Sequence, residues 1–399
     1  MRGEKNADFT EVTCTLGKNT RGVSDISDDT ALPKKQSQAY KILELIAVLG
    51  EVPTRQIKRL AGGERYKELV LIELRKSKLI YTFYQDKLRG LRLTGKAKDL
   101  LIDACPDRFE FFLIGSTETN IIKSEFKRRL RLHRVAQAFI TMLNSDVSMM
   151  RDEKPNVFSP MANSTEIVYP SFYLSREVKE LGARATAIRG SRSVGILLTA
   201  SAAFAVYNMG EALMKWDYRA EMRVKTLMVT LLCHERESSR YAADSVRGLV
   251  LADTMEMAYQ LMSLTGEAKR NFFILDGSFD RFHFVTNDHA GENVIRILCD
   301  DELDAELRSV LSADLFTRSA GSMFENDALD ANGQPVLFAY TFDMPRIARF
   351  NSALILHACR GTIICFDFQA EVLRRYCCDL VTIQAVDLKM FERNFLDEN

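Results

Sequence analysis

The sequence predicts a mixed protein of the α+β and α/β classes, with a small helical front part and a larger part built on a mixed sheet. Three observations predict it. Residues 37–105 carry three helical patterns followed by two short strand patterns. After residue 165, helical and strand patterns alternate. The length of 399 residues is too great for one ordinary hydrophobic core.

Composition limits the class of protein. A hydrophobic content of 47% and a charged content of 27% are typical of a soluble globular chain. Residues 1–36 are polar and mixed in charge, so we expect a disordered tail rather than an export signal. No apolar run is long enough to span a membrane, and the eight cysteines form no CxxC pair or zinc spacing. We therefore expect a cytoplasmic protein with free thiols and no membrane partner.

The net charge of zero hides an asymmetry along the chain. Residues 33–134 hold 23 Lys and Arg against 12 Asp and Glu, whereas residues 270–399 hold 12 against 21. A basic front half is typical of a nucleic-acid-facing surface, so we expect double-stranded DNA as a partner. The acidic rear half suits contact with another protein or with a second copy of the chain.

The front part begins with three helical patterns. The expected elements are helices over 39–49, 54–60 and 64–77, strands over 79–84 and 87–93 around Gln85-Asp86, and a further helix over 96–104. A Gly-Gly turn at 62–63 separates the second helix from the third. This order is that of the winged helix-turn-helix, in which the third helix lies in the major groove. We therefore predict a winged-helix DNA-binding domain over residues 37–112, with protein contact as the alternative use.

Phosphate contacts by cationic side chains dominate the affinity of such domains for DNA. The candidates lie on the second and third helices, the hairpin and the helices that follow. They are Arg55, Lys58, Arg59, Tyr66, Lys67, Arg75, Lys76, Lys87, Arg89, Arg92, Lys96, Arg128 and Arg131.

A long helix is expected over residues 118–144, within a basic connecting segment assigned to 113–147. Its cationic first half either extends the DNA surface or forms an ordinary solvated face. Residues 148–164 contain Pro155 and Pro160 and are expected to be a linker.

The rear part, residues 165–399, is expected to be an α/β domain with a C-terminal extension. The expected strands are 194–199, 203–208, 212–215, 248–252, 271–275, 282–286, 335–342, 362–366 and 381–385. The expected helices are 174–181, 218–233, 255–264, 301–311 and 369–376. This order predicts a mixed three-layer sheet, and its beginning matches the α-β-β-β-α-β core of the restriction-endonuclease-like fold.

The sequence contains no P-loop, GxGxxG, GxSxG or HExxH motif. An active endonuclease-like domain needs a carboxylate on its second strand and Glu-x-Lys on its third, to hold Mg²⁺ beside the phosphate. Asn208 stands where the first carboxylate is wanted, and Glu211 and Lys215 have the wrong spacing. A literal Glu-x-Lys, Glu177 to Lys179, falls on an expected helix.

The candidate catalytic residues are therefore Glu177, Lys179, Asp217 and Glu221. A degenerate or purely structural use of the fold is the favoured alternative. On that interpretation the protein needs no cofactor, and Mg²⁺ is required only if the domain is a nickase. The segment Arg189-Gly-Ser-Arg192 also offers two guanidinium groups for a phosphate.

Several short segments resemble the replication-relaxation family of plasmids and integrative conjugative elements. They are Leu93-Thr-Gly-Lys96, Arg131-Leu-His-Arg134, and the stretches SREVK, SRSVGIL, VYNMG and CFDFQAEVLRRY. The resemblance implies a winged helix joined to an endonuclease-like domain, and a role in replication, relaxation or conjugative mobilisation of element DNA. Related mobilisation relaxases use acidic metal ligands, and the chain departs from that pattern at Asn208 and on the third strand.

Three hypotheses follow. The first is a DNA-binding protein of a mobile genetic element with a degenerate nuclease-like domain. The second is a metal-dependent DNA nickase or relaxase. The third is a winged-helix transcriptional regulator whose rear domain dimerises.

Overall fold

The computed structural model describes residues 31–115, 118–119, 125–155, 157–158, 168–178, 191–236, 240–264, 278–317 and 325–396. From Leu32 onward the chain forms one compact unit, and its described residues have mixed α+β structure with three sheets. None of its described helices has the length and apolar character needed to cross a membrane. The expected tail up to residue 30, the strand at 271–275 and Lys179 lie outside the described residues.

The front part contains the expected three helices and hairpin, together with two elements that the sequence did not predict. Its elements are α1 (Gln38–Leu49), β1 (Val52–Pro53), α2 (Thr54–Ile57), α3 (Glu64–Lys76), β2 (Ile80–Gln85), β3 (Leu88–Leu93), α4 (Gly95–Ala104) and α5 (Pro106–Leu113). The three strands form an antiparallel sheet in the order β1-β3-β2. Ser37 and Thr94 cap α1 and α4 by accepting backbone N–H groups. The unpredicted elements are β1 and α5.

The hairpin turns one residue later than the sequence indicated. Asp86 and Lys87 form the turn, with φ angles of 52° and 61°. Two consecutive left-handed residues match the right-handed twist of a two-residue hairpin. The residues that flank the turn, Gln85 and Leu88, pair across the two strands.

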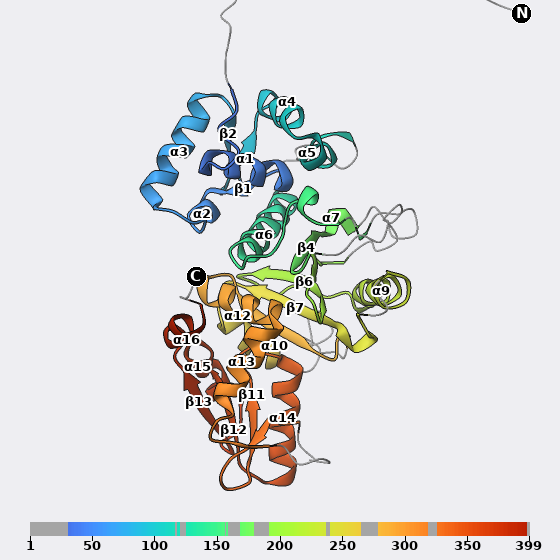
Figure 1. The fold of residues 1–399 in the computed structure, drawn as a ribbon, viewed down its shortest axis with the longest axis vertical. Coiled ribbons are helices and arrows are strands. Elements are labelled where there is room, and N and C mark those ends of the chain that lie inside the picture. The colour runs from blue at the N-terminus through green and yellow to red at the C-terminus, as the bar shows by residue number, and fades with distance from the viewer. Residues whose placement is uncertain are drawn as a thin grey trace, which may run out of the picture. The chain divides into compact units, whose positions relative to one another are not determined.

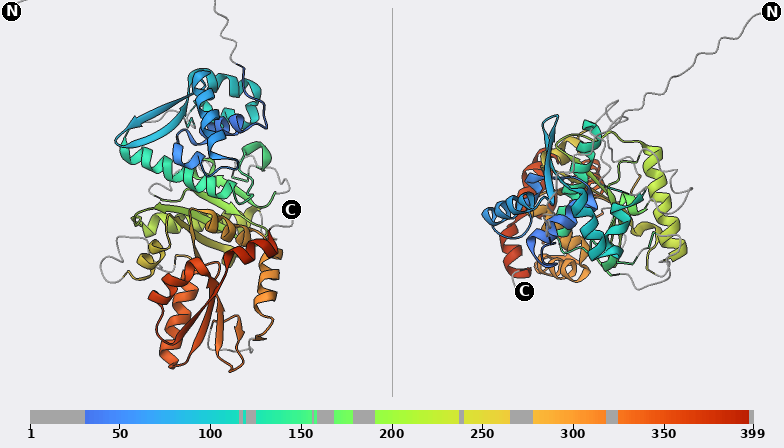
Figure 2. Two further views of the ribbon diagram at one scale, coloured as in Figure 1. Left: turned by 90° about the vertical axis from the view of Figure 1, so that its left-hand side faces the viewer. Right: turned by 90° about the horizontal axis from the view of Figure 1, so that it is seen from above.

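Helix α6 (Phe126–Leu143) lies between the front part and the rest of the described chain (Figures 1 and 2). It begins eight residues later than the helix expected from residue 118. Its apolar C-terminal half is buried, including Phe139, Ile140 and Met142. The helix contacts β1 and β3 of the front part and β6 and α12 of the rear part, and its buried residues belong to one hydrophobic cluster that continues from the front part onto the first sheet.

The rear part contains two five-stranded mixed sheets rather than one. The first has the order β4 (Ser171–Leu174), β5 (Gly195–Leu198), β6 (Ala203–Gly210), β7 (Val246–Ala252), β8 (Phe282–Thr286). Strands β4, β5 and β6 pair antiparallel, and β6, β7 and β8 pair parallel. The helices of this portion are α7 (Ser175–Val178), α9 (Tyr218–Met228), a π-helical continuation (Val229–Arg236), α10 (Glu256–Met262) and α12 (His289–Cys299).

The second sheet lies toward the C-terminus (Figure 1). Its order is β13 (Val381–Val386), β12 (Gly361–Phe366), β11 (Pro335–Phe338), β10 (Ala328–Leu329), β9 (Phe316–Thr317). The accompanying helices are α13 (Asp301–Leu311), α14 (Met344–His357), α15 (Asp367–Tyr376) and α16 (Leu388–Phe395). Bridge pairing of His283 with Asp343 links β8 of the first sheet to the N-terminus of α14.

The three-strand meander of the first sheet differs from the expected one. It starts with β4 and ends with β6, and residues 212–215 form no strand of that sheet. The helix expected at 174–181 follows the first strand instead of preceding it. Asn208 therefore lies on the third strand of the meander, and the described residues of that strand carry no carboxylate.

Candidate nucleic-acid interface

A buried ionic cluster joins the hairpin to α6. The Glu51 side chain is fully buried and accepts hydrogen bonds from Arg92 at 2.7 and 2.9 Å and from Arg129 at 2.7 Å. The ring nitrogen Nε2 of His133 lies 2.7 Å from the same carboxylate. Burial alone would raise the pKa of Glu51, but the hydrogen bonds from His133, Arg129 and Arg92 outweigh it and lower the pKa to about 2.

Arg129 also holds the turn of the hairpin. Its guanidinium donates to the carbonyl oxygens of Gln85 at 2.7 Å and Leu88 at 3.0 Å, on either side of the turn. The guanidiniums of Arg92 and Arg129 lie over the ring of Phe83, 3.7 and 4.6 Å from its centroid. Arg129 therefore anchors the hairpin to α6 at its turn and at Phe83.

Three of the predicted DNA contacts belong to the fold instead. Arg92 is in the buried cluster above. Lys67 is 3% exposed, and its ammonium group donates to the carbonyls of Lys58 and Leu60, both at 2.6 Å. Arg59 bonds to Glu292 of α12 and donates to Thr141 of α6 at 2.9 Å. These three cations bond to groups of the protein instead of to solvent. The expectation that they contact DNA phosphates is therefore corrected.

Most of the other predicted contacts lie on the surface. Lys96 is half-buried, and the exposed ones are Arg55, Lys58, Tyr66, Arg75, Lys76, Lys87, Arg89, Arg128 and Arg131. Several have a partner within the chain. Arg55 pairs with Glu211 at 3.6 Å, Lys58 with Glu64 at 3.5 Å, and Arg128 with Glu125 at 3.0 Å. Such exposed pairs are weak and exchange readily for phosphate oxygens.

A cleft of about 540 Å³ opens beneath the hairpin. Four cationic side chains line it, namely Arg55 after β1, Lys87 and Arg89 of the hairpin, and Arg134 of α6. Two carboxylates, Glu211 and Asp253, lie on the opposite wall. The cleft therefore brings together cations that are up to 79 positions apart in the sequence.

Arg134 connects this cleft to a second group of arginines around the start of β5. Burial lowers the pKa of Arg134, the charge of Asp253 opposes that shift, and the charge of Arg192 acts with it. Arg131, one helical turn before, donates to the carbonyl of Ser191 at 3.5 Å. Burial and the neighbouring charge of Arg131 together lower the pKa of Arg176 on α7. We call the seven side chains Arg55, Lys87, Arg89, Arg131, Arg134, Arg176 and Arg192 the cation track.

Three members of the track, Arg134, Arg176 and Arg192, are not among the DNA contacts expected from the sequence by residue. Arg134 lies on the cationic half of the long helix that was expected to extend the DNA surface or form a solvated face, and Arg192 belongs to the pair with Arg189 that was expected to offer guanidiniums for a phosphate. Arg176 was expected only as part of the SREVK stretch, because its proximity to α6 depends on how β4 and α7 pack in three dimensions.

The three described candidate catalytic carboxylates each have a structural partner. Glu221 is fully buried and accepts hydrogen bonds from the Ser191 hydroxyl, the Arg192 backbone N–H and the Tyr207 hydroxyl, at 2.8 to 2.9 Å. Burial is the main cause that raises the pKa of Glu221, against those hydrogen bonds.

Glu177 is 2% exposed, lies 3.2 Å from the ammonium group of Lys154 and accepts the Leu174 backbone N–H at 2.8 Å. Asp217 caps α9 by accepting two backbone N–H groups. No group of three His, Cys, Asp or Glu side chains suited to a metal ion occurs in the part of the chain that the structure describes. The oxygens of these carboxylates already accept the hydrogen bonds named above, so this donor set does not fit a Mg²⁺ site.

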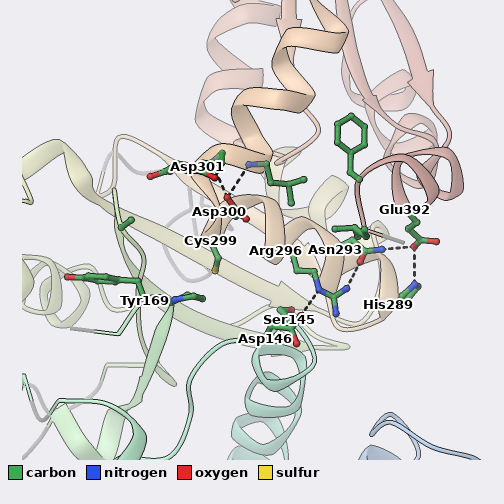
Figure 3. Close-up of a pocket in the computed structure, with 16 residues that line it drawn as sticks. Ser145, Asp146, Tyr169, His289, Asn293, Arg296, Cys299, Asp300, Asp301 and Glu392 are labelled. Atoms are coloured by element: carbon green, nitrogen blue, oxygen red, sulfur yellow. Dashed lines mark hydrogen bonds and ion pairs between the residues drawn. The ribbon is translucent and has the colours of Figure 1, made fainter. Parts of the chain in front are cut away.

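A larger hollow of about 860 Å³ lies between α12, α13 and α16 (Figure 3). Its polar side chains mostly bond to one another. Arg296 donates to Asn293 at 2.7 Å and to Asp146 at 3.1 Å, and His289 lies 2.9 Å from Glu392. The dashed lines in Figure 3 trace these contacts along the wall of the hollow. Because the partners are internal, we assign this region to the packing of the rear part.

Comparisons with protein-family models, with curated proteins and with solved structures each gave no match.

Proposed function

We propose that the chain is a double-stranded DNA-binding protein that holds the phosphate backbone along the cation track. The observation that carries the proposal is the convergence of seven cationic side chains from five separate segments onto the cleft and the adjoining α6 surface. Cations that lie this close repel one another. Binding of a polyanion is therefore favoured both by its attraction to each cation and by the removal of the repulsion between them.

The front part supports the same function. Its element order and its β1-β3-β2 sheet support the winged-helix interpretation, with the hairpin as the wing. The buried Glu51 cluster keeps Lys87 and Arg89 in place against α6, so little conformational entropy is lost when they meet phosphates. On this proposal the wing and α6 together bind the phosphate backbone of the DNA.

The wider role follows from the sequence resemblance and is part of the proposal. A protein of this kind acts on element DNA in replication, relaxation or mobilisation by holding a defined duplex segment. The strand order of the first sheet, with an α9 crossover to the parallel strand β7, supports an endonuclease-like architecture in a non-cleaving form.

Binding of a fluorescent duplex at several salt concentrations tests the proposal. Affinity should fall steeply as salt rises, because each phosphate contact releases a condensed counterion. Removing one contact in Arg89→Ala, Arg131→Ala or Arg192→Ala should weaken binding and reduce the slope of log affinity against log salt by about 1. Arg360→Ala removes an equally exposed arginine near β12 and should leave both quantities unchanged.

A flat salt response, or equal effects of Arg360→Ala and Arg131→Ala, would overturn the cation track as the DNA site. Incubation with supercoiled plasmid, with and without Mg²⁺, separates binding from cleavage. Recovery of intact supercoils after protein removal is the expected result. Metal-dependent open circles that persist after protein removal would instead establish a nickase.

A further inference from the structure

Helix α3 presents an apolar stripe to solvent that the cation track does not use. The inner face of the helix is buried through Val70, Leu71 and Leu74. On the outer face, Tyr66 is 56% exposed, Leu69 is 58% exposed and Ile72 is 45% exposed. These three residues recur every third position, so they form one stripe along the helix. An exposed stripe of this kind on a soluble protein marks a contact surface.

Charged side chains flank the stripe in an order that is symmetric about Leu69. Tyr66 and Ile72 lie three residues on either side of it, and Arg65 and Glu73 lie four residues on either side. Arg65 and Glu73 are both exposed, and among the described residues neither side chain has an ion-pair or hydrogen-bond partner. The stripe therefore has a positive charge on the N-terminal side of Leu69 and a negative charge on its C-terminal side.

We propose that α3 pairs with α3 of a second copy of the chain, antiparallel and about a twofold axis at Leu69. In that arrangement the two Leu69 side chains meet on the axis, and Tyr66 of each copy packs on Ile72 of the other. Arg65 of each copy then faces Glu73 of the other, so both ends carry an opposite-charge pair. Such a self-complementary patch is what a twofold interface requires.

The size of the surface sets the strength of the association. A helix of 13 residues is about 20 Å long, and two such helices bury less than the roughly 1,200 Å² typical of stable complexes. We therefore expect a weak dimer whose population rises with protein concentration. The DNA proposal uses different side chains, so the failure of one proposal leaves the other standing.

Sedimentation velocity of the full chain over a concentration series tests the pairing. The wild-type protein should shift from monomer toward dimer as concentration rises. Leu69→Glu places two carboxylates on the axis and should leave a monomer throughout. Leu356→Glu introduces the same charge at a 79% exposed leucine on α14 and should dimerise like the wild type. A wild-type protein that stays monomeric, or a loss of dimer in Leu356→Glu as well, overturns the proposal.

Charge reversal tests the register and does not depend on a single variant. Arg65→Glu and Glu73→Arg should each weaken the dimer, because each places like charges opposite one another. The double variant restores both pairs with their signs exchanged and should recover dimerisation. Failure of that recovery contradicts the axis at Leu69. If Leu69→Glu leaves the mass unchanged but weakens DNA binding, the stripe is a DNA-contacting face and the dimer proposal is wrong.

Discussion

Glu51 is the residue on which the front part and α6 both depend. Its carboxylate is the shared acceptor for two guanidiniums and lies against one imidazole, all out of contact with solvent. A buried charge of this kind is costly to form but far more costly to break on one side, since its partners stay behind without a counter-charge. The conformation of the hairpin that we propose to contact DNA therefore depends on one acidic side chain that is not itself part of the proposed contact.

Replacing Glu51 by glutamine should lower the free energy of unfolding by about 3–5 kcal/mol, because two buried cations lose their charge partner. Urea denaturation followed by circular dichroism measures the loss. Glu211→Gln removes a carboxylate that is 76% exposed and pairs with Arg55, so it should cost less than about 1 kcal/mol. Equal losses in the two variants would show that the Glu51 cluster adds no net stability.

The pH dependence of the same residue has a definite sign. The pKa of Glu51 lies below its ordinary value of 4.5, at about 2, so ionised Glu51 stabilises the folded state above pH 4.5. That contribution is lost as the pH falls from about 4.5 to about 2. The stability of the wild type should therefore fall more steeply over this window than that of Glu51→Gln. Parallel curves for the two proteins would contradict the assignment.

Among the secondary-structure elements, strand β3 is shaped to admit the Glu51 carboxylate. A Cβ atom at Gly90 would lie 2.2 Å from an oxygen of Glu51 and 2.3 Å from its Cγ. Gly90→Ala should therefore displace that buried carboxylate and destabilise the fold by about 1–3 kcal/mol, the range for overpacking. Gly95→Ala meets nothing within 4 Å at the start of α4 and should be neutral or slightly stabilising. Thermal unfolding of the pair of variants measures the contrast.

The elements also show where sequence reasoning succeeds. Helices α1, α3, α13 and α15 were predicted because their apolar spacing is regular, and in two of them a side chain, Ser37 or Asp300, caps the N-terminus. Helix α12 was missed because it begins HAGEN, with a glycine that lowers helix propensity. That glycine is required, since a Cβ at Gly291 would lie 1.8 Å from the carbonyl oxygen of Thr286. The need for it comes from the strand beneath, which a linear pattern does not contain.

The candidate site divides in the same way. Composition located the basic front half, and the hairpin cations Lys87 and Arg89 were selected correctly as surface residues. The internal pairing of Arg59, Lys67 and Arg92 was not predictable, because their partners lie on α12, in the turn after α2 and at Glu51. Arg and Lys are buried only when an acceptor pairs with them. When that acceptor is distant in the sequence, the pairing produces no periodic pattern from which it could be predicted.

At the scale of the whole molecule, α6 ties the front part to the first sheet through hydrogen bonds on its polar side. Asn208 donates to the Arg134 carbonyl at 2.8 Å, Asn144 donates to Glu292 at 2.8 Å, and Thr141 bonds to Asn287 at 3.2 Å. The residues from Leu32 onward also cluster as one compact unit. These contacts predict that the parts unfold together.

Trp216 is the only tryptophan in the chain and is 8% exposed, packed near Tyr207 and Phe282 of the first sheet. Its fluorescence in urea should therefore change at the same midpoint as the circular dichroism of the whole chain, because α6 joins the front part to the sheet on which Trp216 packs. Two separate midpoints would show that the front part is an independent folding unit.

The anchoring of the hairpin by Arg129 has a consequence for protein engineering. In most hairpins the turn residues themselves determine which residues pair across the strands, so the turn tolerates little change. Here a helix holds the main chain on both sides of Asp86 and Lys87, at Gln85 and Leu88. The turn residues therefore need not determine the strand pairing, and the turn becomes a site for grafting. Loops of different length or chemistry inserted at this point should leave the strand pairing intact while changing what the tip of the hairpin contacts.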